Sequence, residues 1–326
     1  MPAPRSQDVL IRAARMYYLD GRSQGEIAKA LGVSRSSVSR MLLSARERGI
    51  VEIRIHQDRS LTRNADLEAE LMKRFSLQSA QVVARSPGRT AVDVVGEMAA
   101  RLFEKVVPGL SRFGLSWGET VASFAEHVQV EPVYPRLELC PLAGGAPSMQ
   151  PTGASGHVAL DTLARRCGAV PYRFDSPAIV ESELTWRALN QESAIVQALE
   201  RARRCEVAVV GIGRLGVHSS SRVIRAMRLN PEEEEAFMAQ GPVGDICGHF
   251  FDIEGRPLGL PTSHRVIGLT IEQLDEIPSA VGIAAGMEKA VGVLGALRTG
   301  VLTQFIGDEE LAAAVVRAAD EAPTRH

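Results

Sequence analysis

The hydrophobic positions at the start of the chain follow the period of short helices. Apolar side chains recur every three or four positions between residues 7 and 19, where they include Val9, Leu10, Ala13, Met16 and Tyr17. Gly21 ends this pattern. A second helix is predicted to begin after Ser23, because Glu26 three residues later completes a reciprocal capping box.

A glycine separates the second helix from a third. Gly32 permits the left-handed backbone that a sharp turn between helices requires, and Val33 is placed to fill the corner. Ser34 is a suitable N-cap for the third helix. The helical period predicts that its buried face consists of Val38, Met41, Leu42 and Ala45.

The opposite face of the third helix carries hydroxyl and guanidinium groups. Arginine can bind guanine through two hydrogen bonds, and serine reaches phosphates or base edges. We therefore expect the following residues to contact an operator in double-stranded DNA: Ser34, Arg35, Ser36, Ser37, Ser39, Arg40 and Arg46. The alternative is a helical hairpin that serves only packing, with solvated arginines.

Beyond the third helix the pattern changes to alternation. Residues 50–55 alternate apolar and charged side chains, which predicts a short strand. Residues 1–58 are therefore predicted to form a winged helix-turn-helix domain. Residues 59–78 are predicted to form a linker and a short helix, marked by Leu67, Leu71 and Phe75, that packs on the large domain or at a subunit contact.

From residue 79 to residue 326, short β-rich runs alternate with helical patterns. Strands are predicted at residues 80–83, 112–115, 137–141, 207–211, 266–269, 280–284 and 301–306. Helices are predicted at residues 91–106, 119–128, 156–167, 192–203, 287–297 and 309–319. This alternation indicates an α/β domain with a Rossmann-like, mainly parallel sheet covered by helices on both faces.

Composition narrows the class of protein. A hydrophobic content of 45% and a charged content of 23% are ordinary for a globular protein. The chain has neither an apolar run long enough for a membrane span nor a signal-peptide pattern, so we expect a cytoplasmic protein with no membrane partner. The cysteines form no CxxC pair and the histidines no metal motif, so neither a metal nor a cofactor is expected.

The formal charge of −2 is distributed unevenly. Residues 1–58 contain ten Lys and Arg against six Asp and Glu, so the remainder of the chain is acidic. A basic module attached to an acidic body fits a nucleic-acid-binding head.

Glycine-rich loops follow three of the predicted strands. In residues 114–120, Gly118 lets the backbone approach an anion, Ser116 and Thr120 add hydroxyls, and Trp117 lies between them. Gly144 and Gly145 follow the next strand, and Gly213 follows another. Because ligands of such sheets bind at the carboxyl ends of strands, these loops together indicate a pocket.

Two charged residues are candidates for the same pocket. Asp245 lies in a Gly-flanked apolar segment and can accept paired hydrogen bonds from sugar hydroxyls; a capping or turn aspartate is the alternative. Lys289 falls in the first turn of a predicted helix, where a cation opposes the helix dipole unless an anion is near. A solvated lysine is the alternative.

The chain resembles the SorC family of sugar-responsive bacterial transcriptional regulators, first over residues 12–55 and then over nearly its whole length. The resemblance implies that the large domain has the fold of sugar-phosphate isomerases and deaminases and binds a phosphorylated sugar or related effector. It further implies that Ser116, Gly118 and Thr120 bind phosphate, that Asp245 binds sugar hydroxyls and that Lys289 lies near the phosphate. Gly144 and Gly145 match the neighbouring loop.

Two departures from the family pattern stand out. Some members carry an arginine before the glycine pair, where this chain has Ala143, which puts a second phosphate in doubt. The acidic-Thr motif that follows the last strand in the family is replaced here by Gly307-Asp308-Glu309-Glu310.

The leading hypothesis is a regulator, not an enzyme, whose operator affinity is controlled by a sugar, polyol or sugar phosphate. A homodimer or homotetramer is expected, because symmetric oligomers match spaced half-sites. One alternative is a sugar-phosphate isomerase or deaminase with an autoregulatory head, although no acid–base constellation stands out and no catalytic residue is assigned. A second is an oligomerisation scaffold with a vestigial pocket.

Overall fold

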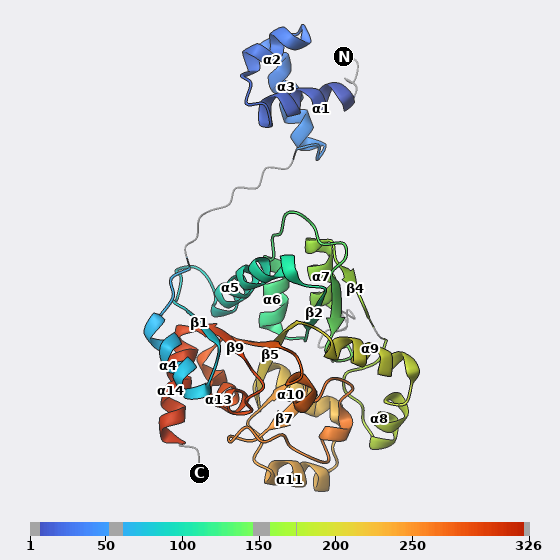
Figure 1. The fold of residues 1–326 in the computed structure, drawn as a ribbon, viewed down its shortest axis with the longest axis vertical. Helices are drawn as coiled ribbons and strands as arrows, with labels where there is room; N and C mark the ends of the chain where they lie inside the picture. The colour runs from blue at the N-terminus through green and yellow to red at the C-terminus, as the bar shows by residue number, and fades with distance from the viewer. Residues whose placement is uncertain (1–6, 52–60, 146–156, 174, 323–326) are drawn as a thin grey trace. The chain divides into compact units, whose positions relative to one another are not determined.

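The computed structural model describes residues 7–51, 61–145, 157–173 and 175–322 of the chain. These residues belong to two compact units, which divide after Ser60 (Figure 1). Each unit has its own hydrophobic core.

The described part of the N-terminal unit contains three helices. They are α1 (Gln7–Tyr18), α2 (Gln24–Leu31) and α3 (Arg35–Glu47), at the positions that the hydrophobic period predicts. Their shared core consists of Leu10, Ala13, Met16, Ile27, Ala28, Val38, Met41 and Leu42. Ile50 and Val51 form a bend, and the rest of the predicted strand at 50–55 lies outside the described residues, so the wing stays a prediction.

The predicted capping signals of this unit are confirmed. The backbone N–H of Ser23 donates to Glu26 Oε2 at 2.8 Å, and the Glu26 N–H donates to Ser23 Oγ at 3.3 Å. Gly32 has a left-handed φ of 64°. Its neighbour Val33 donates its N–H to the Ala28 carbonyl at 3.0 Å, which closes α2 and fixes the direction of the chain into α3.

A parallel sheet forms the centre of the second unit. Its strands lie in the order β1-β9-β8-β5-β2-β3-β4, and a hairpin of β6 and β7 adds antiparallel to β5. The strands are β1 (Ser79–Val83), β2 (Arg112–Leu115), β3 (Glu138–Pro141), β4 (Val170–Pro171), β5 (Val207–Arg214), β6 (Gly244–Ile246), β7 (His249–Phe251), β8 (Ser279–Ala284) and β9 (Gln304–Asp308). The predicted α/β class with a mainly parallel sheet is therefore confirmed.

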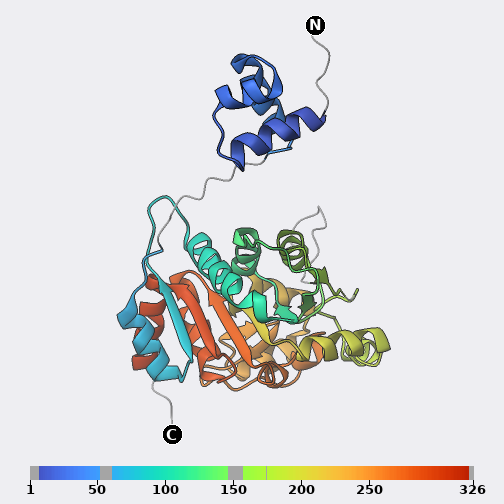
Figure 2. The same cartoon turned by 45° about the horizontal axis from the view of Figure 1, so that its top comes forward.

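Helices cover both faces of the sheet, as Figure 2 shows. One face packs against α5 (Ala91–Val106), α6 (Glu119–His127) and α7 (Val158–Cys167), and the other against α4 (Ala65–Phe75), α13 (Ala290–Arg298) and α14 (Glu309–Glu321). β5 shows the alternation: Val207 and Val209 enter the first core, and Ala208 and Val210 the second. The helix predicted from Leu67, Leu71 and Phe75 is α4, and it packs on the large unit.

Three of the predicted strands need correction. The strand predicted at residues 207–211 continues to Arg214, because the β6–β7 hairpin pairs with its end, so Gly213 lies in β5 rather than in a loop after it. Residues 266–269 form only isolated bridges, Val266 with Ile179 and Gly268 with Ala143, because their apolar pattern reflects burial beside a loop rather than a ladder. The last strand begins at Gln304 rather than at residue 301. Leu302, which precedes the strand, is buried against Gly282. The apolar pattern of the sequence therefore begins before the first residue that pairs in the sheet.

The pattern of the chain also left several elements unpredicted. These are the β6–β7 hairpin, β4, α8 (Glu183–Leu189), α10 (His218–Met227), α12 (Ile271–Leu274) and the short turns η1 (Val107–Gly109), η2 (Ser263–Arg265) and η3 (Met287–Lys289). The glutamates from Glu232 to Glu235 after Pro231 predict the start of a solvated helix, and α11 (Pro231–Ala239) confirms it. The helix predicted at 287–297 is divided into η3 and α13. Of these elements, α10, β6 and η3 contribute to the site described below.

The close packing of α5 against α6 offers a test of this architecture. A Cβ on Gly96 of α5 would lie 2.8 Å from Ser123 Cβ and 2.9 Å from the backbone nitrogen of Phe124 in α6. Gly96→Ala should therefore lower the free energy of unfolding by about 1–3 kcal/mol, the usual cost of overpacking, measured by urea denaturation. Gly109→Ala is the control, because no atom lies within 4 Å of its added Cβ. Equal urea midpoints for Gly96→Ala and the parent would contradict the predicted packing.

Candidate functional site

The third helix of the N-terminal unit presents the predicted polar face. Ser34 caps it by accepting the Ser37 N–H at 3.2 Å, and Val38, Met41, Leu42 and Ala45 are buried as predicted. Arg35, Ser36, Ser39, Arg40 and Arg46 are exposed, whereas Ser37 is half-buried. Among the described residues, no ion pair holds Arg35 or Arg40, so their guanidinium groups are available to a ligand.

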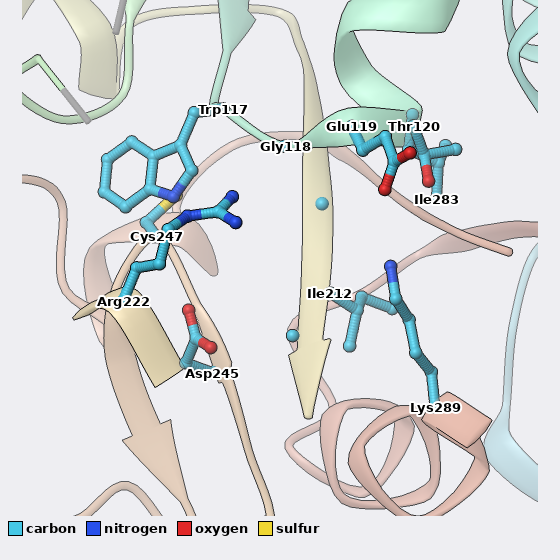
Figure 3. Close-up of a pocket in the computed structure, with 12 residues that line it drawn as sticks. Trp117, Gly118, Glu119, Thr120, Ile212, Arg222, Asp245, Cys247, Ile283 and Lys289 are labelled. Atoms are coloured by element: carbon cyan, nitrogen blue, oxygen red, sulfur yellow. The ribbon is translucent and has the colours of Figure 1, made fainter. Parts of the chain in front are cut away.

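A small pocket lies where the strands of the parallel sheet end. It brings together residues from loops that are far apart in sequence, shown in Figure 3. Its lining consists of Trp117, Gly118, Glu119, Thr120, Gly211, Ile212, Gly213, Arg222, Asp245, Cys247, Ile283 and Lys289. Six of the predicted effector-binding residues are in this set: Trp117, Gly118, Thr120, Gly213, Asp245 and Lys289.

The other three predicted residues lie outside this lining. Ser116 is buried, and its hydroxyl accepts the Gly211 N–H at 2.9 Å, so it joins the loop after β2 to β5. Gly144 donates its N–H to the Ile267 carbonyl at 2.9 Å, and Gly145 donates to the Ser176 carbonyl at 2.8 Å. The described contacts of the glycine pair are thus backbone packing, and the loop that follows them lies outside the described residues.

The loop after β2 presents unsatisfied donors to the pocket. Gly118 precedes α6 with a φ of 137°, a conformation that favours glycine, and provides no side-chain cap for the helix. The Thr120 hydroxyl is buried and has no hydrogen-bond partner among the described residues. Free N–H groups at a helix start and a buried free hydroxyl together suit an oxyanion.

Lys289 lies in the pocket as a buried cation. Its side chain comes from η3 after β8 and extends toward Glu119 and Thr120 (Figure 3). It is only 9% exposed, and in the described part of the chain no hydrogen bond or ion pair of its ammonium is found. Burial lowers the pKa of Lys289, while the surrounding carboxylates, Glu119 first among them, oppose this shift.

Asp245 lies in the pocket as a fixed carboxyl group. It accepts hydrogen bonds from the Ser220 hydroxyl and from the Gly248 N–H, the latter at 3.2 Å. Gly213 pairs with it across β5 and β6 and must lack a side chain, because a Cβ there would overlap the carboxylate. Burial raises the pKa of Asp245, which favours its neutral form.

Sequence reasoning missed two charged residues of the lining. Arg222 belongs to α10, a helix that the pattern did not predict, and it lines the pocket together with Trp117 and Asp245 (Figure 3). Glu119 is part of the predicted loop, but its carboxylate was not recognised as a pocket group. The serines before Arg222 resemble a loop, so no signal in the pattern indicated a helix there.

The described residues contain neither a cluster of metal-ligating side chains nor a helix long and apolar enough to span a membrane. What the pocket offers is two cations, two carboxylates, free N–H groups and an indole face. This combination can bind a small polar anion.

Comparison with known proteins agrees with this arrangement. Residues 59–317 match the family model described as "Putative sugar-binding domain". The chain is 28% identical over 307 residues to the sorbitol operon regulator of Klebsiella pneumoniae, covering 93% of this chain and 96% of that protein. It is also 28% identical over 319 residues to the transcriptional regulator LsrR of Escherichia coli K12, covering 95% of each.

Solved structures show the same likeness. The full-length sorbitol operon regulator SorC from Klebsiella pneumoniae has a TM-score of 0.70 and 27% identity, covering 95% of this chain and 100% of that chain. A DeoR family transcriptional regulator from Listeria monocytogenes has a TM-score of 0.68 and 26% identity over 77% of this chain and 98% of that chain. These relatives are transcriptional regulators rather than enzymes. The chain therefore belongs to the SorC family of sugar-binding transcriptional regulators, and the enzyme alternative is set aside.

Proposed function

We propose that a phosphorylated sugar or polyol of a catabolic pathway binds in the pocket of the large unit and controls the affinity of α3 for operator DNA. The observation that carries this proposal is the buried, unpaired ammonium of Lys289 facing the start of α6. A buried charge is costly unless it is directly paired, and none of the nearby carboxylates forms an ion pair with Lys289 among the described residues. A bound phosphate would supply such a direct partner.

The remaining lining residues fit the rest of such a ligand. We assign Gly118, Thr120 and Lys289 to the phosphate, and Asp245 to ligand hydroxyls. Trp117 offers an apolar face to the ring or chain of the sugar, and Gly213 gives the ligand access to β5. Ser116, Gly144 and Gly145 support the neighbouring loops.

The proposal also concerns the chemical class of the effector. The name of one relative, the sorbitol operon regulator, places a sugar alcohol among the candidates. A melting-temperature screen should compare phosphorylated and unphosphorylated sugars and sugar alcohols in matched pairs. We expect stabilisation by the phosphorylated member of a pair and no product; turnover of any compound would support the enzyme alternative instead.

On the DNA side, we assign operator contact to Ser34, Arg35, Ser36, Ser37, Ser39, Arg40 and Arg46. Residues 1–58 would act as the DNA-binding head, residues 59–78 as the connection, and residues 79–326 as the effector-binding and oligomerisation domain. A homodimer or homotetramer would present two heads to the two half-sites of an operator.

The first prediction concerns the buried cation. Lys289→Met keeps most of the side-chain volume and removes the charge, so affinity for the best phosphorylated ligand of the screen should fall about ten- to hundredfold by calorimetry. Affinity for its unphosphorylated counterpart should not change. Lys73→Met, which removes an exposed lysine of α4, is the matched control. Equal affinities of Lys289→Met and the parent for the phosphorylated ligand would remove Lys289 from the site.

The second prediction concerns pH. Since burial lowers the pKa of Lys289, its ammonium loses its proton below the usual range of lysine as the pH rises. Ligand affinity should therefore decline as the pH is raised from about 7, above the second ionisation of phosphate. Calorimetry should give a flat profile for Lys289→Met over the same range. A parent profile that does not decline would show that the charge of Lys289 is not used.

The third prediction concerns DNA. Arg35→Ala and Arg40→Ala should each weaken operator binding by about 1–3 kcal/mol in a mobility-shift titration, the value of a two-bond contact to a base. The melting shift caused by the phosphorylated ligand should persist in both variants. Arg187→Ala, an exposed arginine of α8, should bind DNA like the parent. If both helix variants kept full DNA affinity, the assignment of α3 would be wrong.

A further inference from the structure

The acidic residues at the end of β9, which differ from the family motif, make contacts in two directions. Asp308 is buried, and its Oδ2 accepts the Gly286 N–H at 2.8 Å, while its Oδ1 caps α14 by accepting the Leu311 N–H at 3.0 Å. Gly286 is the N-cap of η3, the turn that carries Lys289. The carboxylate of Asp308 is therefore hydrogen-bonded both to the N-cap of η3 and to the start of α14.

Glu309, the next residue, makes the second contact. Its Oε1 accepts a hydrogen bond from Asn64 Nδ2 at 2.6 Å. Asn64 in turn caps α4 by accepting the Leu67 N–H at 3.1 Å and donates its own N–H to the Val82 carbonyl at 2.9 Å. The carboxylate of Glu309 is therefore joined to the point where the chain meets the edge of the sheet.

Residues 62–64, which we call the anchor, are hydrogen-bonded to the edge of the sheet. The Ala84 N–H donates to the Thr62 carbonyl at 2.8 Å, and Arg63 bridges antiparallel to Val83. Arg63 also forms two bonds of 2.6 and 2.8 Å with Glu68, a buried carboxylate that accepts the Val82 N–H. In sequence, the anchor lies close after the division between the two units at Ser60.

We propose that Asp308 and Glu309 form a relay that couples occupation of the pocket to the anchor at residues 62–64. An anion bound to Lys289 restricts the motion of η3. The hydrogen bonds of Asp308 to Gly286 and Leu311 extend this restriction to the start of α14. The hydrogen bond between Glu309 and Asn64 extends it to the anchor. The relay rests on the proposed function, since it requires an anion in the pocket. By thermodynamic linkage, any contact that restricts the motion of the anchor must also raise the affinity of the pocket for the anion.

A purely structural role for the acidic residues gives a different expectation. Acidic side chains in the first turn of a helix are stabilising through the helix dipole alone, and Glu310 also provides such a charge. Glu310 pairs with Arg85 at 3.3 Å on the surface, where both side chains are largely exposed, and it does not contact the anchor. Glu310→Ala is therefore a matched control for Glu309→Ala.

Hydrogen–deuterium exchange of the full chain with inorganic phosphate tests the relay without knowledge of the operator. The amides to follow are those of Asn64 and Ala84 in the anchor pairing, and those of residues 118–120 in the pocket. In the parent we expect phosphate to slow exchange at both places, by at least about fivefold at the anchor, the lower end of ordinary coupling.

The variants separate the relay from the pocket. In Glu309→Ala and Asn64→Ser, phosphate should still protect residues 118–120 but should no longer protect the anchor. Asn64→Ser keeps a cap for α4 and removes the amide donor. Glu309→Gln, which retains an acceptor for Asn64, and Glu310→Ala should respond like the parent.

Three results would overturn the relay. The first is protection of the pocket by phosphate without protection of the anchor in the parent, and the second is a parent-like anchor response in Glu309→Ala. The third is loss of the anchor response in Glu310→Ala, because the charge of the first turn would then explain it. If phosphate protected neither place in the parent, the phosphate pocket would fail, and the relay with it.

Discussion

The burial of one ammonium group without a carboxylate partner is the constraint on which the pocket depends. Lys289 is nearly enclosed, yet the nearby Asp245 is committed to Ser220 and Gly248. Burial raises the pKa of Asp245 and lowers the pKa of Lys289, so both groups are less readily charged here than in water. Keeping such a group out of water lowers the stability of the fold when no anion is bound. An anion that binds the ammonium relieves this cost, and the free energy that is regained contributes to its binding affinity.

Three glycines make this burial possible. A Cβ on Gly244 of β6 would lie 2.5 Å from the Gly213 carbonyl oxygen and 2.9 Å from Gly292 Cα, and a Cβ on Gly292 of α13 would lie 2.5 Å from the same oxygen. The backbones of β5, β6 and α13 therefore touch directly. A side chain at any of these positions would prevent this contact, which brings Lys289 and Asp245 into the lining of one pocket at the end of β5.

The sequence predicted the elements whose signals are local and left out those defined by tertiary contact. The capping box at Ser23, the turn at Gly32 and the helix at residues 91–106 follow from local chemistry, and the structure has all three. α10 starts without a side-chain cap after Val217, so nothing local marked the helix that carries Arg222. Lys289 was recognisable as an unusual cation, but its lack of an ion pair is a property of the assembled pocket.

The separate cores of the two units limit how a ligand can act on DNA affinity. A ligand shifts an equilibrium only by the difference in its interaction energy with the two states, and this difference must reach the N-terminal unit through contacts that change. A hydrogen bond to a charged group contributes about 1.5–3 kcal/mol, or roughly ten- to hundredfold in an equilibrium constant. One bond of the kind that joins Glu309 to Asn64 is therefore sufficient for coupling of ordinary size, and no rearrangement of the sheet is required.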